Sequence, residues 1–367
     1  MMKKRMIWAV AGLMALSACQ QAPGYVIQGT ATGAADGDTI FLQNFDGANM
    51  IKMDSAIVKN GTFEFKGMPD SLVESRYVTY MKGDNRMSTM LFVEKGNIQV
   101  VLDPENSKVS GTPNNDILQQ FSDMFAAISK DLNDTYRKCQ MDSTLTEEQK
   151  DSVEQVLDRK QEEGLDKVFN MVTANIDKPV GVYLLASFGP SFDVKKMQPL
   201  FKQIPAAYSS QPEIVSLKEY VETAAKTAEG ETYIDFTMNT PEGNPVKLSD
   251  YVSKNTYTLI DFWASWCGPC KKEMPTVVEA YAKYKGKGFG VVGVSLDNNA
   301  ESWKQAIKDL QITWPQMSDL KGWQCEGAAL YGVRAIPATV LVDQQGTIIA
   351  RNLRGSALMN KLDELMK

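Results

Sequence analysis

YTLIDFWASWCGPC, residues 257–270, is the stretch of the chain that decides the fold of its C-terminal part. Residues 257–263 are an apolar run of the kind that forms a buried strand. Cys267 and Cys270 follow it, spaced so that their sulfurs can close a small disulfide ring. If a helix begins here, Cys267 lies at its N-terminus, where unpaired N–H groups and the helix dipole favour a thiolate. The pattern predicts a nucleophile, a resolving thiol and a reversible two-electron couple.

Two other uses of such a cysteine pair are a structural zinc site and an inert structural disulfide. A structural zinc ion takes four Cys or His ligands. The chain has no histidine, and Cys139 and Cys325 belong to no second pair of this spacing. We therefore expect no metal site.

A carboxylate and a proline accompany the pair. Asp261 lies within the apolar strand, where burial is costly, so its pKa should be raised and it could exchange a proton with Cys270 through water. The alternative is a core aspartate whose hydrogen bonds are satisfied. Further along, Ile336-Pro337 precedes the apolar run 340–342. A proline there suggests a cis peptide bond in a tight turn, which leaves the backbone of Ile336 free to pair with an extended substrate.

These features make residues 229–367 resemble a thioredoxin domain, and within that fold the TlpA-like disulfide reductases of the bacterial envelope. The resemblance includes an expected strand pair, a final helix, a long opening segment and an inserted stretch: Ala338–Asp343, Thr347–Asn352, Ser356–Met366, 235–250 and 295–333.

The resemblance also implies roles for single residues. Glu273 matches an acidic position of the members that act in cytochrome c maturation, the alternative being an exposed acid in the first turn of a helix. Asp261 matches ordinary thioredoxin, whereas many TlpA-like proteins carry Asn there. This difference argues against a close transfer of the cytochrome-specific function.

The residues between the cysteines indicate the direction of electron flow. Gly268-Pro269 supplies neither charge nor a side-chain donor, so the disulfide is relatively favoured and the dithiol is a good electron donor. We predict a reductase of protein disulfides in which Cys267 attacks and Cys270 resolves, assisted by Asp261.

The surroundings of the pair complete the predicted mechanism. Ile336 and Pro337 shape the substrate groove and Trp266 covers one side of it. No nicotinamide, flavin or metal site is expected, so a membrane thiol–disulfide donor of the family's usual kind must reduce the pair again.

The N-terminus resembles a bacterial lipoprotein signal. Residues 3–5 are basic, residues 7–15 are apolar, and Leu16-Ser17-Ala18-Cys19 resembles a lipobox. The expectation is a signal peptide over 1–18, a lipidated Cys19 and a linker over 19–24; a generic signal with an accidental cysteine is the alternative. Two or more acyl chains suffice for stable attachment. No acidic retention signal follows the cysteine, which favours the outer membrane, facing the periplasm.

Two further regions precede the thioredoxin-like part, giving a multidomain α+β / α/β chain. Residues 25–112 alternate in polarity, with a hairpin expected at Asn60-Gly61, and resemble an uncharacterised β-rich, sandwich-like domain of envelope lipoproteins. They are a spacer, a docking module or purely structural.

Residues 113–228 have helical periodicity. They contain a capping box at 146–149, a helix opening at Lys178-Pro179, and shorter helices expected near 195–203 and 213–226. Net charge is −6, and nothing in the composition favours nucleic-acid binding.

Two cysteines and two rival functions remain. Cys139 is expected in the polar turn between the first two helices as a bystander, and Cys325 at the start of a helix, either as a packing residue or as a third exchanging thiol. One rival function is a binding lipoprotein whose pair only senses redox state. The other is a peroxiredoxin-type peroxidase, which needs Pro and Thr before its cysteine, whereas Pro275 and Thr276 follow the pair here.

Overall fold

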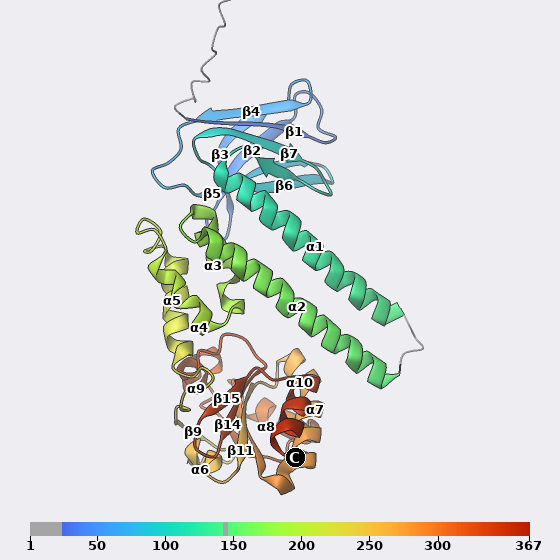
Figure 1. The fold of residues 1–367 in the computed structure, drawn as a ribbon, viewed down its shortest axis with the longest axis vertical. Helices are drawn as coiled ribbons and strands as arrows, with labels where there is room; N and C mark the ends of the chain where they lie inside the picture. The colour runs from blue at the N-terminus through green and yellow to red at the C-terminus, as the bar shows by residue number, and fades with distance from the viewer. Residues whose placement is uncertain (1–23, 142–145) are drawn as a thin grey trace, which may run out of the picture. The chain divides into compact units, whose positions relative to one another are not determined.

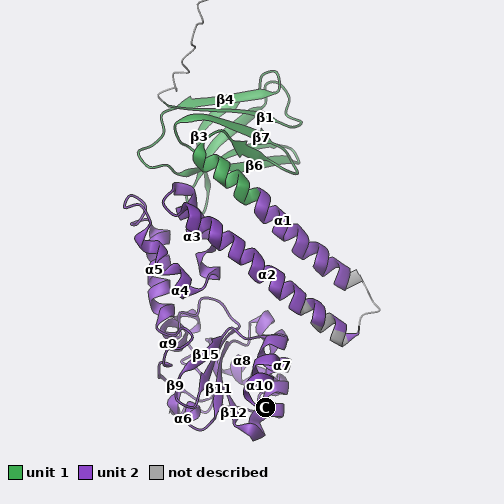
Figure 2. Cartoon of the chain, viewed as in Figure 1, with its two compact units in different colours: residues 1–122 green, residues 123–367 purple. Residues whose placement is uncertain are grey.

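The computed structural model describes residues 24–141 and 146–367 (Figure 1). The expected signal peptide, the lipidation site Cys19 and the linker up to residue 23 lie outside the described residues. The chain divides into two compact units, residues 1–122 and residues 123–367 (Figure 2). Within the described ranges, no helix combines the length and the apolar character needed to cross a membrane.

The N-terminal unit contains two four-stranded sheets, with the orders β4-β1-β7-β8 and β3-β2-β5-β6. Alternate strand residues are buried, such as Ile27 and Ile98 in one sheet and Ile40 and Val78 in the other. This alternation is expected of strands that have one apolar face, and it confirms the predicted β-rich, sandwich-like fold. The strands are β1 (Tyr25–Ala31), β2 (Thr39–Phe45), β3 (Met50–Ile57), β4 (Thr62–Gly67), β5 (Ser75–Lys82), β6 (Asn85–Phe92), β7 (Gly96–Leu102) and β8 (Lys108–Ser110).

The hairpin predicted at Asn60-Gly61 is present only at its turn. Both residues have positive φ, 53° and 72°, and Lys59 pairs with Thr62 across the turn. Beyond this bridge, however, β3 pairs with β2 and β4 pairs with β1. The tight turn therefore carries the chain from one sheet to the other, and the prediction of a paired hairpin was wrong.

The first turns of α1 (Pro113–Met141) belong to the N-terminal unit. The side chain of the buried Asn115 accepts the N–H of Phe92 and donates to its carbonyl oxygen, at 2.8 Å in each case. Compactness therefore places the end of this unit at residue 122, ten residues beyond the limit of 112 expected from the change to helical periodicity.

The helical part continues with α2 (Glu147–Asn175), α3 (Pro179–Phe188), α4 (Val194–Met197) and α5 (Pro212–Ala225). The capping box is confirmed: the Thr146 hydroxyl accepts the N–H of Gln149, and the Gln149 side chain accepts the N–H of Thr146. The single helix expected near 195–203 is instead α4 and a short 3-10 turn over 200–202. Pro199 separates the two, since it has no N–H to continue the helix.

Cys139 does not lie in a turn between helices. It lies in the last turn of α1, which continues to Met141. No glycine or proline occurs between residues 133 and 141 to end the helix earlier, so the polar composition there was misread as a turn.

The C-terminal part is built on a five-stranded sheet with the order β13-β12-β11-β14-β15. The central strand β11 runs parallel to β12 and antiparallel to β14. The strands are β11 (Tyr257–Trp263), β12 (Phe289–Ser295), β13 (Gln316–Met317), β14 (Ala338–Asp343) and β15 (Ile348–Arg351), preceded by the small pair β9 (Thr237–Asn239) and β10 (Pro245–Lys247). The helices are α6 (Ser249–Val252), α7 (Gly268–Tyr284), α8 (Ala300–Asp309), α9 (Glu326–Leu330) and α10 (Gly355–Leu365). The predicted thioredoxin fold is confirmed.

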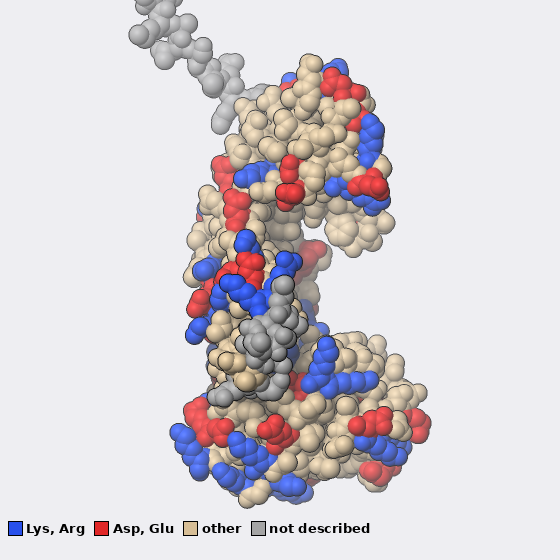
Figure 3. Space-filling view, turned by 90° about the vertical axis from the view of Figure 1, so that its right-hand side faces the viewer, with Lys and Arg blue, Asp and Glu red and all other residues tan. Residues whose placement is uncertain are grey.

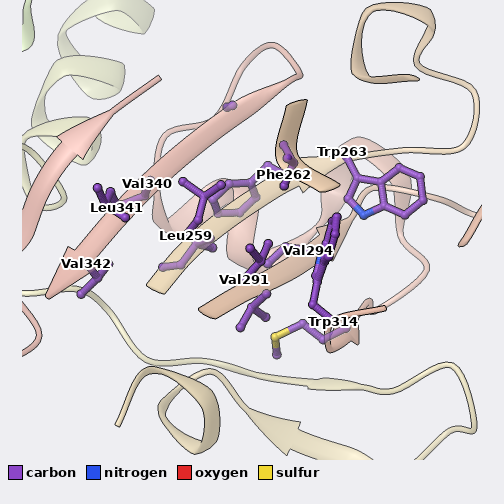
Figure 4. Close-up of a cluster of buried hydrophobic side chains, with 14 of the residues drawn as sticks. Leu259, Phe262, Trp263, Val291, Val294, Trp314, Val340, Leu341 and Val342 are labelled. Atoms are coloured by element: carbon purple, nitrogen blue, oxygen red, sulfur yellow. The ribbon is translucent and has the colours of Figure 1, made fainter. Parts of the chain in front are cut away.

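The core of this part lies against the central strands. Leu259, Phe262, Val291 and Val340 are each less than 3% exposed, and Figure 4 shows their side chains lying beside one another. A strand that is buried on both faces has a nearly continuous apolar sequence, and for this reason the apolar run 257–263 predicted β11. Asp261 is the one carboxylate within that strand.

The charged side chains of the face shown in Figure 3 are mixed in sign. Lys and Arg residues lie beside Asp and Glu residues at several places on that face, with uncharged residues between them.

Candidate active site

The cysteine pair occupies the junction between β11 and α7. Cys267 is the N-cap of α7, and its sulfur accepts the N–H of Cys270 at 3.1 Å. Pro269 lies in the first turn, where a missing N–H costs no helical hydrogen bond. The two sulfurs form a disulfide, with a distance of 5.3 Å between the Cα atoms. The local sequence thus places Cys267 where helix N–H groups can stabilise a thiolate.

The loop between strand and helix is fixed by a buried aspartate that sequence reasoning missed. Asp297 is 1% exposed, and its carboxylate accepts hydrogen bonds from the N–H and the hydroxyl of Ser265 and from the hydroxyl of Ser295. It follows β12, the parallel neighbour of β11, at the edge where active-site loops gather. A polar residue directly after an apolar run was the signal available in the sequence.

The Ile336-Pro337 peptide bond is cis, as predicted, and it lies beside the disulfide. The carbonyl oxygen of Ile336 is 3.7 Å from the sulfur of Cys267. Cys267 is 4% exposed and Cys270 is 1% exposed, so Cys267 is the more accessible of the two.

Asp261 lies at the middle of β11, opposite Gly293 of β12 and Thr339 of β14. It is 3% exposed, and burial, followed by the charge of Glu273, raises its pKa to about 7; Arg354 acts in the opposite direction. A carboxyl group with this pKa can accept and release a proton near neutral pH.

Glu273 is not an exposed acid in the first turn of a helix. Because α7 begins at Gly268, Glu273 lies in the second turn, is half-buried, and accepts the N–H of Gly355 at 2.7 Å. The neighbouring Arg354 donates to the carbonyl oxygen of Pro337. Glu273 and Arg354 therefore connect α7, the start of α10 and the cis-proline turn.

Trp266 is half-exposed beside the pair and has an aromatic neighbour that sequence reasoning did not identify. The ring of Trp323 lies 6.0 Å from the ring of Trp266, and the two side chains are 51% and 50% exposed. Trp323 belongs to the inserted stretch 295–333, whose return to the active site could not be predicted from spacing alone.

The remaining candidates from the sequence are two free cysteines and Cys19, which lies outside the described residues. Cys325 is a free thiol with no exposed surface, at the N-cap of α9, and burial raises its pKa to about 11. Cys139 is also free. Within residues 24–141 and 146–367, no group of three or more His, Cys, Asp or Glu residues is arranged to hold a metal ion.

Two family models match the chain. The AhpC/TSA family matches residues 230–351, and a domain of unknown function, DUF4369, matches residues 25–118. The first covers the disulfide, Asp261 and the cis-proline turn, and the second covers the β-rich unit.

Known proteins match the same C-terminal part. The thiol-disulfide oxidoreductase ResA of Bacillus cereus is 30% identical over 148 residues, which are 40% of this chain and 82% of that protein. ResA of Oceanobacillus iheyensis is 36% identical over 118 residues, covering 32% of this chain and 58% of that protein. Among solved structures, the thioredoxin domain of a thiol-disulfide oxidoreductase from Bacteroides vulgatus is 35% identical, covers 38% of this chain and 99% of that chain, and has a TM-score of 0.36.

The family follows from the share of ResA that the chain covers, together with the disulfide at a helix N-terminus and the cis-proline beside it. The chain belongs to the ResA-like thiol-disulfide oxidoreductases, the TlpA-like branch of the thioredoxin family, and it is an oxidoreductase enzyme that acts on disulfide bonds.

Proposed function

We propose that the protein reduces disulfide bonds of other proteins in the cell envelope, with Cys267 as nucleophile and Cys270 as resolving thiol. The observation that carries this proposal is the position of Cys267. Its sulfur lies at the N-terminus of α7 and beside the carbonyl oxygen of Ile336. The residue is thus both activated and next to backbone that an extended substrate can pair with.

The reaction has two exchange steps. The Cys267 thiolate attacks one sulfur of the substrate disulfide, and the other substrate sulfur leaves as a thiolate. Cys270, deprotonated with help from Asp261, then attacks the Cys267 sulfur and releases the second substrate thiol. The substrate gains two electrons, and the Cys267–Cys270 pair becomes the disulfide seen in the structure.

The substrate is a protein segment in this proposal. Residues 334–336 have no backbone–backbone hydrogen bond among the described residues, so Ile336 is available to pair with a strand-like segment. Trp266 and Trp323 add half-exposed aromatic surface next to Cys267. Such rings contact apolar side chains with little loss of conformational freedom.

The direction of electron flow is tested by the redox potential of the pair. Gly268 and Pro269 bring no charge near Cys267, so we expect a reducing couple, closer to about −270 mV than to about −120 mV. The measurement is equilibration with thiol–disulfide buffers of known potential, read out by alkylation of Cys267 and Cys270. A potential at the oxidising end would contradict a reductase.

The proposal also places the protein at a membrane through a lipid on Cys19, with the catalytic part facing the periplasm and a membrane thiol–disulfide protein as electron donor. This placement rests on the lipobox-like residues 16–19. The limits 25–112, 113–228 and 229–367 remain the proposed domain division, with the β-rich domain as spacer or docking module.

The lipid anchor is tested by Cys19→Ser. We expect the wild-type chain to incorporate labelled fatty acid and to fractionate with membranes, because two or more acyl chains anchor stably. The variant should incorporate none and lose most of its membrane association. Equal labelling of both chains would exclude Cys19 as the acceptor. The sucrose-gradient position of the wild-type chain distinguishes outer from inner membrane.

A further inference from the structure

The cis-proline turn has a support from outside the sheet. Residues 332–337 have no regular secondary structure. Backbone hydrogen bonds attach Gly332 and Val333 to α9, but residues 334–336 have none among the described residues. The position of this segment therefore depends on side-chain contacts. At its end, Arg354 donates to the carbonyl oxygen of Pro337.

Arg334, two residues before Ile336, joins the segment to α5. Its guanidinium donates to the carbonyl oxygen of Ser216 at 3.1 Å and lies over the ring of Tyr220, 4.6 Å from the ring centre. Ser216 and Tyr220 are four residues apart, so they share one face of α5. Arg334 therefore makes two kinds of interaction with α5, because a planar guanidinium can donate a hydrogen bond and also stack on an aromatic ring.

A second set of contacts holds the end of α5, and the residues directly after it, against the catalytic part. The half-buried Arg351, at the end of β15, donates to the carbonyl and hydroxyl oxygens of Thr227, each at 2.7 Å, and to the carbonyl oxygen of Tyr331 at 2.8 Å. A Cβ atom added to Gly332, which has a φ of 62°, would lie only 3.0 Å from Cβ of Ala224. Gly332 and Arg334 therefore lie against α5, near Ala224 at its end and at Ser216 and Tyr220 further back.

We propose that α5 supports the substrate-binding part of the active site. Arg334 is a positioning residue that fixes the cis-proline turn against α5. Through Arg334, the segment that precedes the thioredoxin-like domain sets where the backbone of Ile336 meets a protein substrate. This inference rests on the proposed function, since it concerns how the same site binds its substrate. It also gives the helical region a role in substrate binding.

The role predicts a specific change in kinetics. In the full chain, Arg334→Ala should raise KM for insulin, with dithiothreitol as electron donor, about fivefold. The kcat value should change less than twofold, because the contact holds the docking backbone and not the reacting sulfurs. Tyr220→Ala should give a similar rise, and Arg334→Lys a smaller one. The double variant should be no worse than Arg334→Ala, because both changes remove one contact.

The controls separate this role from a structural one and from failure of the proposed function. Lys218→Ala removes an exposed charge from the same helix and should leave KM unchanged. Hydrogen exchange of the amides of Gly332 and Val333, which are hydrogen-bonded to α9, should become faster in Arg334→Ala whether or not the chain reduces insulin. A wild-type chain that does not reduce insulin would contradict the proposed function alone. Unchanged exchange at Gly332 and Val333 in Arg334→Ala, or an unchanged KM, would overturn the role of α5.

Discussion

Cys267→Ser is expected to abolish protein-disulfide reduction, with turnover falling at least about 10³-fold. Serine keeps the N-cap position, because its oxygen can accept the N–H of Cys270 as the sulfur does in the structure. It has no thiolate, however, and cannot form a mixed disulfide. The loss should therefore reflect chemistry and not unfolding. Insulin reduction, followed together with thermal unfolding, measures both.

Cys270→Ala should fail differently. The nucleophile remains, so the first exchange proceeds and the enzyme stops as a mixed disulfide with its substrate. Non-reducing gels of cell extracts should show that species, and mass spectrometry identifies the partner. Cys139→Ser is the matched control, because it removes a free thiol from the helical part and should keep full activity.

These variants also decide between the enzyme and its rivals. A binding lipoprotein that only senses redox state would lose no ligand capture in Cys267→Ser. A peroxidase would consume hydrogen peroxide in a way that depends on Cys267 and would show no preference for protein disulfides. Persistent insulin reduction by Cys267→Ser would show that Cys267 is not the nucleophile.

The local parts of the site could be predicted from the sequence, and the reason is physical. An apolar run followed by W-C-G-P-C fixes a buried strand, a helix start and the place of Cys267 within one short segment. The cis bond before Pro337 could be expected because cis peptide bonds occur almost only before proline and typically in tight turns, and this proline lies at such a place before an apolar strand. Asp261 stood out because a carboxylate in a buried strand is costly.

The parts contributed by distant segments could not be predicted. Asp297 and Trp323 reach the site through the packing of β12 and of the inserted stretch, and α5, far away in the sequence, reaches it through Arg334. Nothing in the spacing of those residues indicates which surface they meet. The same limit explains the error at Asn60-Gly61, where the turn was read correctly but the partners of β3 and β4 depend on the closure of two sheets.

Asp261→Asn is expected to make the oxidised protein more stable above pH 7. Burial raises the pKa of Asp261 from 3.8 to about 7. Below pH 3.8 the carboxyl group is protonated in both the folded and the unfolded chain, and the substitution has little effect on stability. As the pH rises towards 7, the unfolded chain releases the proton while the folded chain retains it, so the stability of the wild-type protein falls.

The difference between a pKa of 3.8 in the unfolded chain and about 7 in the folded chain corresponds to roughly 4 kcal/mol in the free energy of unfolding. This is the largest gain in stability that Asp261→Asn can give at alkaline pH. Denaturant unfolding of both proteins at several pH values between 4 and 9 measures this difference. Glu273→Gln provides a second check. Because the charge of Glu273 raises the pKa of Asp261, removing it should shift the pH dependence to lower pH, while the Gln oxygen still accepts the N–H of Gly355.

The stability gained by Asp261→Asn should be accompanied by slower catalysis. An amide cannot accept the proton of Cys270, so resolution of the mixed disulfide should slow by roughly 10²-fold near neutral pH. Attack by Cys267 should change little, and mixed disulfide should therefore accumulate during turnover. Greater stability with unchanged resolution would leave Asp261 as a buried, costly residue without a role in proton transfer. A wild-type protein whose stability does not vary between pH 4 and 9 would contradict the raised pKa itself. Both results together would require Cys270 to lose its proton by a route that does not involve Asp261.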